Sequence, residues 1–399
     1  MRIVPLPANV LRPGQPVPLS LRDARGGLLL AKGNSLATQQ MVDALLARGL
    51  WVDADESEAL MRSFHGRLDQ MVRGNALIGD IASAQPTTAG AGPAAAAKST
   101  VRVSDLSALV RQANTTLRDP ASPHFLDGVM RLAAELQARL EENPDRMLLW
   151  LVHNAGREME HYSASHALLV ATVCGLSARH VPHWKVPQMA SLCGAALTMN
   201  VSMTALQDLL AHQDQALSAA QKSQVEDHAQ ASAALLRQAG LGDELWLTAV
   251  IHHHDAKPGP LPERPLGQQL ARLLQRADLF AARLSPRRRR RPLSAAGAAQ
   301  VTYLDENKQP DEAGTALIKA TGICPPGGMV QLASGEQGIV IRRGRLANQP
   351  MVAALIGKSG LPLSEPVVRN TAQPAHAIAR TLAVHEVKML VPIETVLSL

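Results

Sequence analysis

Aromatic side chains are scarce in this chain of 399 residues, which has four tryptophans, two tyrosines and three phenylalanines. With 2% aromatic and 46% apolar residues, the core must be built from leucine, alanine, valine and methionine. Alanine, leucine and methionine favour helices, whereas β-sandwiches are rich in aromatic and β-branched residues. The composition therefore predicts a mainly α fold, and the length predicts two or three structural units.

Cysteines and long apolar runs are also few. Cys174, Cys193 and Cys324 show no Cys-x-x-Cys spacing, which argues against a disulfide framework and against a thiolate zinc site. This usage fits a reducing, cytoplasmic compartment. The N-terminal segment lacks the pattern of a secretory signal, and no uncharged apolar run reaches the length of a bilayer span. We therefore expect a cytoplasmic protein without a membrane span.

Changes in composition divide the chain into four segments. Residues 1–80 read as a small α+β module with a β-hairpin that turns at Gly26-Gly27. Residues 81–100 form a low-complexity linker that is too poor in large apolar groups to order itself. Residues 101–322 show helical periodicity, and residues 323–399 change to short strands between turns. We expect a helical domain followed by a β-rich C-terminal extension.

The formal net charge is +6, and much of this excess lies in the run Arg287–Arg291. Such a run attracts phosphates or acidic partners. A solvated loop is the alternative reading of the same residues.

Histidines and one aspartate carry the chemistry of the helical segment. His166 shares a helix face with Val170 and Val173, so its imidazole is expected to point toward a core. His228 lies on another predicted helix, and Asp278 sits among apolar neighbours, where a carboxylate is costly unless it is paired or metal-bound. Imidazole with carboxylate suits a divalent iron, manganese or zinc ion.

Three consecutive histidines, His252 to His254, precede a helix stop at Lys257-Pro258-Gly259. Three adjacent imidazoles cannot all face one metal, whereas two of them can point inward at the end of a helix. This favours His253 and His254 as ligands, with Asp255 accepting an imidazole N–H behind them. A polar helix end, at which histidine interacts well with the helix dipole, is the alternative.

At these positions the chain resembles the HD-GYP subgroup of the HD-domain metal-dependent phosphohydrolases, which hydrolyse cyclic di-GMP. The resemblance implies an HD-domain helical bundle with five metal ligands. The segments that carry it are Tyr162–His166, Lys222–His228, Ala249–Asp255, Ala271–Asp278 and Pro325–Gly338. The implied ligands are His166, His228, His253, His254 and Asp278. If the domain binds a nucleotide, the candidate contacts to its phosphate are Arg272, Arg287 and Arg288, because a guanidinium group binds phosphate well.

The chain departs from the family at the His-Asp pair itself. The apolar run Leu192–Leu197 is followed by Thr198-Met199 where the family has that pair. A His254-Asp255 register for the pair leaves too little chain before Asp278. The family's Asp bridges two metals, and neither threonine nor a methionine thioether replaces such ligands for hard cations. We therefore expect one divalent metal in preference to two.

Three functions stay open on this sequence. The favoured one is a degenerate nucleotide-signalling or regulatory domain with weak or no hydrolysis, which binds cyclic di-GMP or a related nucleotide and a protein partner. The second is an active metal-dependent cyclic di-GMP phosphodiesterase. The third is a protein-interaction scaffold similar to HDOD domains, which has no need of His253 and His254. None of the three predicts a DNA partner.

Overall fold

The computed structural model describes residues 3–6, 17, 19–32, 34, 45, 49–57, 103–157, 159–286, 291–387 and 389–399. The chain divides into two compact units, Met1–Ser99 and Thr100–Leu399. The predicted linker 81–100 and the predicted phosphate contacts Arg287 and Arg288 lie outside the described residues.

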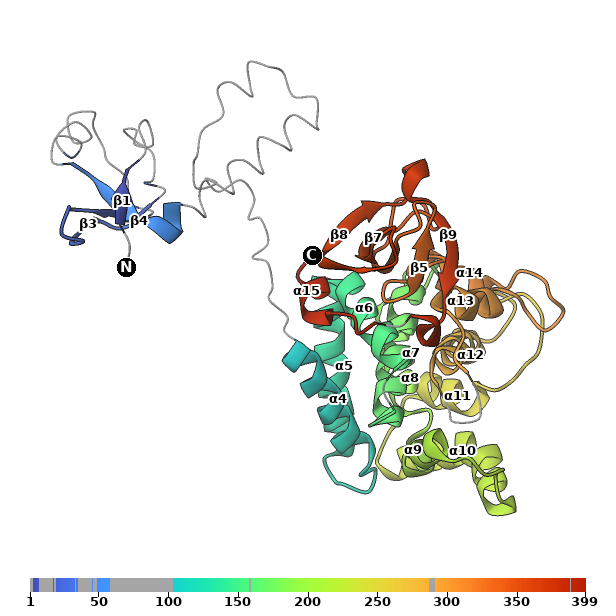
Figure 1. Cartoon of the computed structure of the whole chain (residues 1–399). Helices are drawn as coiled ribbons and strands as arrows, with labels where there is room; N and C mark the ends of the chain where they lie inside the picture. The colour runs from blue at the N-terminus through green and yellow to red at the C-terminus, as the bar shows by residue number, and fades with distance from the viewer. Residues whose placement is uncertain are drawn as a thin grey trace. The chain divides into compact units, whose positions relative to one another are not determined.

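The first unit contains a four-stranded sheet in the order β1-β4-β2-β3 (Figure 1). The predicted hairpin is confirmed, because β2 and β3 pair antiparallel and Gly26 adopts a φ of 83° at the turn. The Asp23 carboxylate accepts a hydrogen bond of 2.8 Å from the Gly27 amide and so closes the turn. The strands are β1 (Ile3–Pro5), β2 (Leu21–Arg22), β3 (Leu28–Leu30) and β4 (Trp51–Asp53).

The second unit is mainly α-helical with a β-rich C-terminal part, as the sequence predicts. Its central helix is α7, which packs against α4, α5, α6, α8, α9, α12 and α14 and is therefore buried on nearly every side. The helices are α4 (Val103–Leu117), α5 (Phe125–Glu142), α6 (Pro144–Ala155), α7 (Tyr162–Ala178), α8 (Val186–Thr198), α9 (Thr204–His212), α10 (Ala219–Gln238), α11 (Glu244–His252), α12 (Leu266–Leu284), α13 (Ala295–Tyr303), α14 (Glu312–Thr321) and α15 (Ile393–Leu397).

A five-stranded antiparallel sheet in the order β8-β7-β6-β5-β9 follows the helices. It packs on α6 through β6 and belongs to the same compact unit as the helices. At the junction Gly327 has a φ of 90°, and a Cβ there would lie 2.5 Å from the carbonyl oxygen of Leu149 on α6. Only glycine fits this contact. The strands are β5 (Met329–Leu332), β6 (Gln337–Arg342), β7 (Met351–Ile356), β8 (Pro362–Asn370) and β9 (Ile378–Leu382).

One stretch, Val186–His212, is long and apolar enough to cross a bilayer by length and composition. In the fold it comprises α8, a short 3-10 turn and α9, and 61% of its most apolar window is buried inside the protein. Buried core helices of soluble proteins share these properties.

Candidate metal centre

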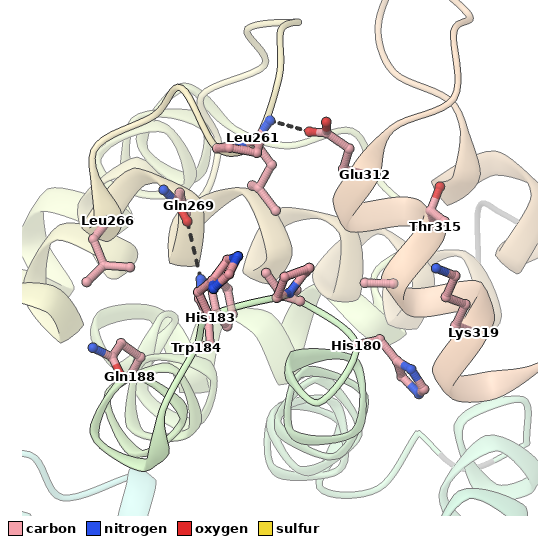
Figure 2. Close-up of a pocket in the computed structure, with 14 residues that line it drawn as sticks. His180, His183, Trp184, Gln188, Leu261, Leu266, Gln269, Glu312, Thr315 and Lys319 are labelled. Atoms are coloured by element: carbon pink, nitrogen blue, oxygen red, sulfur yellow. Dashed lines mark hydrogen bonds between the residues drawn. The ribbon is translucent and has the colours of Figure 1, made fainter.

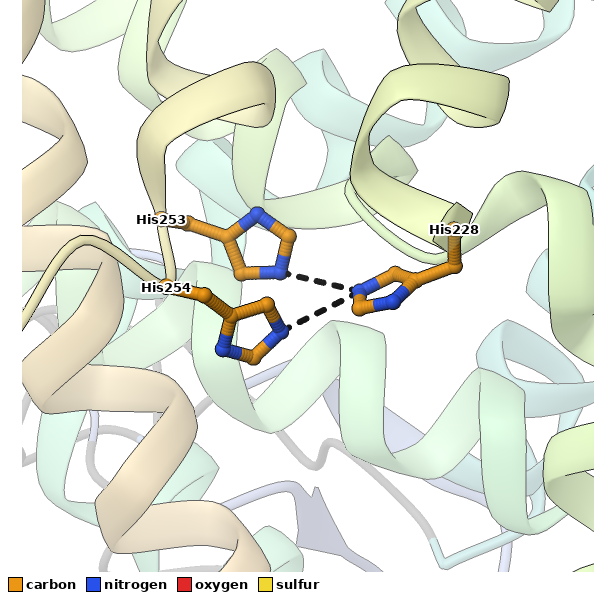
Figure 3. A group of neighbouring side chains, drawn as sticks. All are labelled: His228, His253 and His254. Atoms are coloured by element: carbon orange, nitrogen blue, oxygen red, sulfur yellow. Dashed lines mark hydrogen bonds between the residues drawn. The ribbon is translucent and has the colours of Figure 1, made fainter. Parts of the chain in front are cut away.

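Three imidazoles converge where α10 meets the end of α11. His228 projects from α10. His253 and His254 directly follow α11, and their rings point toward His228 (Figure 3). The Nε2 atom of His228 lies 3.2 Å from the Nε2 atom of His253 and 3.2 Å from that of His254. Three nitrogens that each lie about 2.1 Å from one Zn²⁺ are separated by about 3.4 Å in tetrahedral geometry. The spacing therefore matches that of ligands around one metal.

The backbone fixes which ring nitrogens face the centre. Nδ1 of His228 lies 2.6 Å from the carbonyl oxygen of Val225, and Nδ1 of His253 lies 2.6 Å from that of Val250. Each Nδ1–H donates to its carbonyl, so each neutral ring carries a lone pair on Nε2. Two lone pairs that face each other repel, whereas a shared cation satisfies both. The donor set therefore fits a divalent transition metal.

Burial keeps these rings uncharged. Burial lowers the pKa of His253 to about 3, with a further lowering by the neighbouring His254. Burial also lowers the pKa of His228. Neutral imidazole is the form that binds metal, so both rings are ready to act as ligands at neutral pH.

The cluster opens to solvent on one side. His228 and His253 are 3% and 1% exposed, whereas His254 is an exposed residue. Three protein ligands with one open side are the arrangement of catalytic metal sites, in which the fourth position takes water or substrate. The exposed side at His254 would let water or another ligand reach a metal held by the three rings.

His166 and Asp278 form a pair next to this cluster. The Nε2–H of His166 donates to Oδ1 of Asp278 at 2.7 Å, and Tyr162 stacks on the His166 ring. Burial alone would raise the pKa of Asp278, but the hydrogen bond from His166 and the nearby His253 and His254 hold it well below its usual value. Asp278 is thus a carboxylate anion beside the three histidines. The structure therefore gathers three of the five predicted ligands, His228, His253 and His254, within 4.8 Å of one another, and places the His166–Asp278 pair near enough to interact with their charge.

The structure places Asp255 away from the position predicted for it. Its Oδ2 atom lies 2.9 Å from Nδ1 of His252, the outward-facing histidine of the three. The inward His253 donates instead to the carbonyl of Val250 within its own helix. A carbonyl one turn back is always within reach of a ring at a helix end, so no side-chain acceptor is needed there.

A tryptophan closes the space at Thr198, the position at which the sequence resemblance places a His-Asp pair. Oγ1 of Thr198 donates to the carbonyl of Gly194 and accepts a 2.8 Å hydrogen bond from Nε1 of Trp246 on α11. The indole lies flat against α8, since a Cβ on Gly194 would come within 2.3 Å of it. Thr198 and Met199 are buried, at 0% and 1% exposure. The threonine hydroxyl is committed in both directions and is not available to a metal.

Arg272, predicted to contact substrate phosphate, is engaged in a buried ion-pair network. Its guanidinium donates to both carboxylate oxygens of Glu306 at 2.9 Å and to Oδ2 of Asp311 at 2.8 and 2.6 Å. Arg276 joins the same two carboxylates at 3.3 Å. These contacts fasten α12 to the start of α14, so the structure gives Arg272 a structural position in place of the predicted one.

Comparison with known proteins found no matching family model and no matching curated protein. Among solved structures, the chain is similar to Bd1817, described as a HDG"Y"P protein from Bdellovibrio bacteriovorus. The two share 11% sequence identity with a TM-score of 0.40, and the match covers 80% of this chain and 99% of that chain. A likeness of this strength assigns no role to any residue here.

Proposed function

We propose that this chain is a metal-binding regulatory domain of the HD-GYP type, which holds one divalent metal at His228, His253 and His254. The observation that carries the proposal is the convergence of three imidazole Nε2 atoms, two of them on rings whose Nδ1–H groups are already bonded to backbone carbonyls. Iron, manganese and zinc all accept such a donor set.

Each residue of the cluster has a distinct task in this proposal. The metal supplies Lewis acidity at the open side, toward a water or a phosphate oxygen. His228 and His253 hold it from the buried side, and His254 closes the ring of ligands at the surface. His166 fixes Oδ1 of Asp278, which leaves Oδ2 to accept from a bound water or to complete the ligand set.

Weak or absent hydrolysis is part of the proposal. Attack on a phosphodiester by a bridging water needs two metals and a carboxylate between them. At the family's pair position this chain has a threonine whose hydroxyl is bonded to Trp246, and a buried thioether. A single-metal site retains the capacity to bind phosphate but lacks the second charge that stabilises the transition state.

Cyclic di-GMP or a related nucleotide is the ligand that we propose for the open side, on the strength of the sequence resemblance. The exposed His254 gives a phosphate oxygen a route to the metal. Nucleotide binding would then be transmitted to a protein partner.

Metal analysis of the purified full chain tests the centre. We expect about one equivalent of zinc, iron or manganese per chain in the wild type. His228→Ala is expected to lose it, because two imidazoles remain. His252→Ala is the matched control, since that ring lies on the same turn and pairs with the exposed Asp255. Equal metal content in all three proteins, or none in the wild type, would overturn the proposal.

Nucleotide assays then separate the functional readings. The metal-loaded protein is expected to bind cyclic di-GMP in calorimetry and to turn it over slowly or not at all. Rapid turnover that His253→Ala abolishes would show an active phosphodiesterase in place of a regulatory domain. If the protein binds metal but no nucleotide, the proposed metal site stands and the proposed nucleotide ligand is wrong.

A further inference from the structure

A second cavity lies apart from the histidine cluster and has a volume of about 660 Å³ (Figure 2). Its walls are the connection between α7 and α8, the loop that leads into α12, the first turn of α12, and one face of α14. None of the five residues of the metal centre lines it. The volume falls within the range of about 300–1,000 Å³ that is typical of small-molecule sites.

One corner of this cavity is basic. His180 follows α7, and Lys319 projects from the last turns of α14 beside it (Figure 2). Burial, followed by the charges of Lys319, Arg343 and Arg179, lowers the pKa of His180, so the corner carries a positive potential. Among the described residues, no carboxylate forms an ion pair with Lys319. Lys319 is an exposed residue, so its charge faces solvent at the mouth of the cavity and is open to the anionic group of a ligand.

The middle of the cavity is apolar and its far side carries amides. Trp184 and Leu261 face each other across the middle, and Leu266 extends the apolar wall toward Gln188 (Figure 2). Gln188 and Gln269 line the side opposite Lys319. The cavity thus offers a positive corner, an apolar centre and polar amides in sequence.

Hydrogen bonds hold the walls in place. Nε1 of Trp184 donates to Oε1 of Gln269 at 3.2 Å, which fixes the indole against α12. The Glu312 carboxylate accepts from the backbone N–H of Leu261 and so fastens the loop to α14. Glu312 and Lys319 lie seven residues apart on one helix, about 10 Å along its axis. The acid is therefore committed to the loop at one end, and the lysine is left to a ligand at the other.

We propose that this cavity binds a small organic acid with a flat apolar body, whose anionic group meets Lys319 and His180. The apolar body lies between Trp184 and Leu261, where about 25 cal/mol per Å² of buried apolar area favours binding. A carboxylate and a phosphate monoester share the required chemistry. The site is independent of the metal centre and of the nucleotide proposed there.

Two dyes of matched shape test the anion requirement on the full chain. Anilinonaphthalene sulfonate carries the negative charge, and neutral phenylnaphthylamine lacks it. We expect saturable fluorescence of the sulfonate at one site per chain, and binding of the neutral dye that is about tenfold weaker, as for the loss of one charge-assisted contact. Equal affinities for both dyes would overturn the proposal, because the site would then be apolar only.

Variants locate the dye. Lys319→Ala is expected to weaken binding of the sulfonate dye about tenfold and to leave the affinity for the neutral dye unchanged. Lys222→Ala removes an exposed charge on α10 and serves as the control. Ala316→Trp fills the cavity and is expected to abolish binding of both dyes, with circular dichroism and Tm confirming that each variant folds. Sulfonate binding that survives Ala316→Trp or ignores Lys319→Ala would place the dye elsewhere and overturn the proposal.

Competition distinguishes the two acid classes. Naphthoate and naphthyl phosphate are titrated against the bound sulfonate dye, and the stronger competitor identifies a carboxylate or a phosphate monoester as the preferred group. Displacement by neither acid would count against an organic-acid site.

Discussion

The histidine cluster and the Thr198 region belong to neighbouring helices but are built on opposite principles. In the cluster, the Nε2 atoms of His228 and His253 lie 3.2 Å apart and each carries a lone pair, because the Nδ1–H of each ring donates to a backbone carbonyl. At Thr198, by contrast, the hydroxyl donates to the carbonyl of Gly194 and accepts from the indole N–H of Trp246, whose ring packs against α8. An unsatisfied set of lone pairs calls for a ligand, whereas a satisfied and filled one excludes it.

The two regions differ in what their side chains leave open to a ligand. At Thr198-Met199, where the sequence resemblance placed a His-Asp pair, the hydroxyl is hydrogen-bonded and an indole ring fills the space. In the cluster, backbone carbonyls hold the Nδ1–H groups of His228 and His253 and turn their Nε2 atoms toward the centre. The three histidines therefore form a donor set that suits a metal, whereas Thr198 and Met199 form part of the hydrophobic core.

The largest expected difference between the histidine cluster and the Thr198 region is the effect of a substitution on metal affinity. His253→Ala is expected to lower the affinity for Zn²⁺ on the order of 100-fold or more, because the loss of a direct ligand exceeds the 10–100-fold effect of outer partners. Thr198→Val is expected to leave the affinity unchanged, since its hydroxyl bonds only to Gly194 and Trp246. Competition with a zinc-sensitive dye measures both. A loss in Thr198→Val would place the threonine at the metal.

The packing of Trp246 against α8 is expected to make the stability of the fold sensitive to a larger residue at position 194. Gly194→Ala puts a methyl group within 2.3 Å of the Trp246 ring, so we expect a loss of about 1–3 kcal/mol in the free energy of unfolding. Gly175→Ala on α7 is the control, since its Cβ meets only Leu140 at 3.3 Å and removal of a helical glycine stabilises by about 1 kcal/mol. Urea unfolding gives both values. Equal stabilities of the two variants would argue against the tight packing of the indole.

His153 is a buried imidazole outside the cluster, and its protonation should make the stability of the fold depend on pH whether or not zinc is bound. Burial, aided by the charge of Arg157, lowers the pKa of His153 to about 4. As the pH falls, the unfolded chain takes up this proton before the folded protein does. The free energy of unfolding is therefore unaffected by His153 above about pH 6.5 and decreases as the pH falls from there toward 4. His153→Leu should remove about 1.4 kcal/mol per pH unit from the slope of stability against pH in that window. Urea titrations at several pH values, with and without zinc, measure it. The His153 effect should be the same in both, and an unchanged slope would mean that His153 accepts a proton in the folded protein.

The smallest effect is expected at the outward histidine. His252 and Asp255 are 36% and 44% exposed, and exposed pairs contribute below about 1 kcal/mol. His252→Ala should therefore change Tm little and leave metal stoichiometry at the wild-type value. A clear loss of metal in this variant would mean that the cluster uses a different pair of the three histidines.

Much of the fold was predictable from periodicity. Val129, Leu132, Leu136 and Leu140 recur at the spacing of one helix face, and all four are buried on α5. Asn143-Pro144 ends this spacing, and the Asn143 side chain caps the next helix by accepting from the Arg146 amide. Local signals of this kind need no knowledge of distant residues.

The candidate site was predictable only in part. Helix spacing and the stop after His254 placed two histidines inward and one outward, and the structure has that arrangement. The contact of Trp246 with Thr198 joins residues 48 positions apart, and nothing local in the sequence marks it. Arg272 was predicted to contact phosphate, and its ion pairs could not be foreseen, because its partners Glu306 and Asp311 lie more than 30 residues further along the chain. The cavity beside Trp184 draws on three separate stretches of the chain and has no sequence signature.

Gly327 has a consequence for how the second unit unfolds. Its backbone lies directly on α6, and Gly327 also donates its N–H to Val340 on β6 at 2.8 Å. Arg343, just beyond β6, reaches the carbonyl of Ala320 on α14 and the Asp145 carboxylate on α6. Because this close backbone contact leaves no room for the sheet to shift against α6, we expect the sheet and the helices to unfold together. A boundary at residue 322 marks a change in secondary structure, and a chain cut there would expose the core of α6.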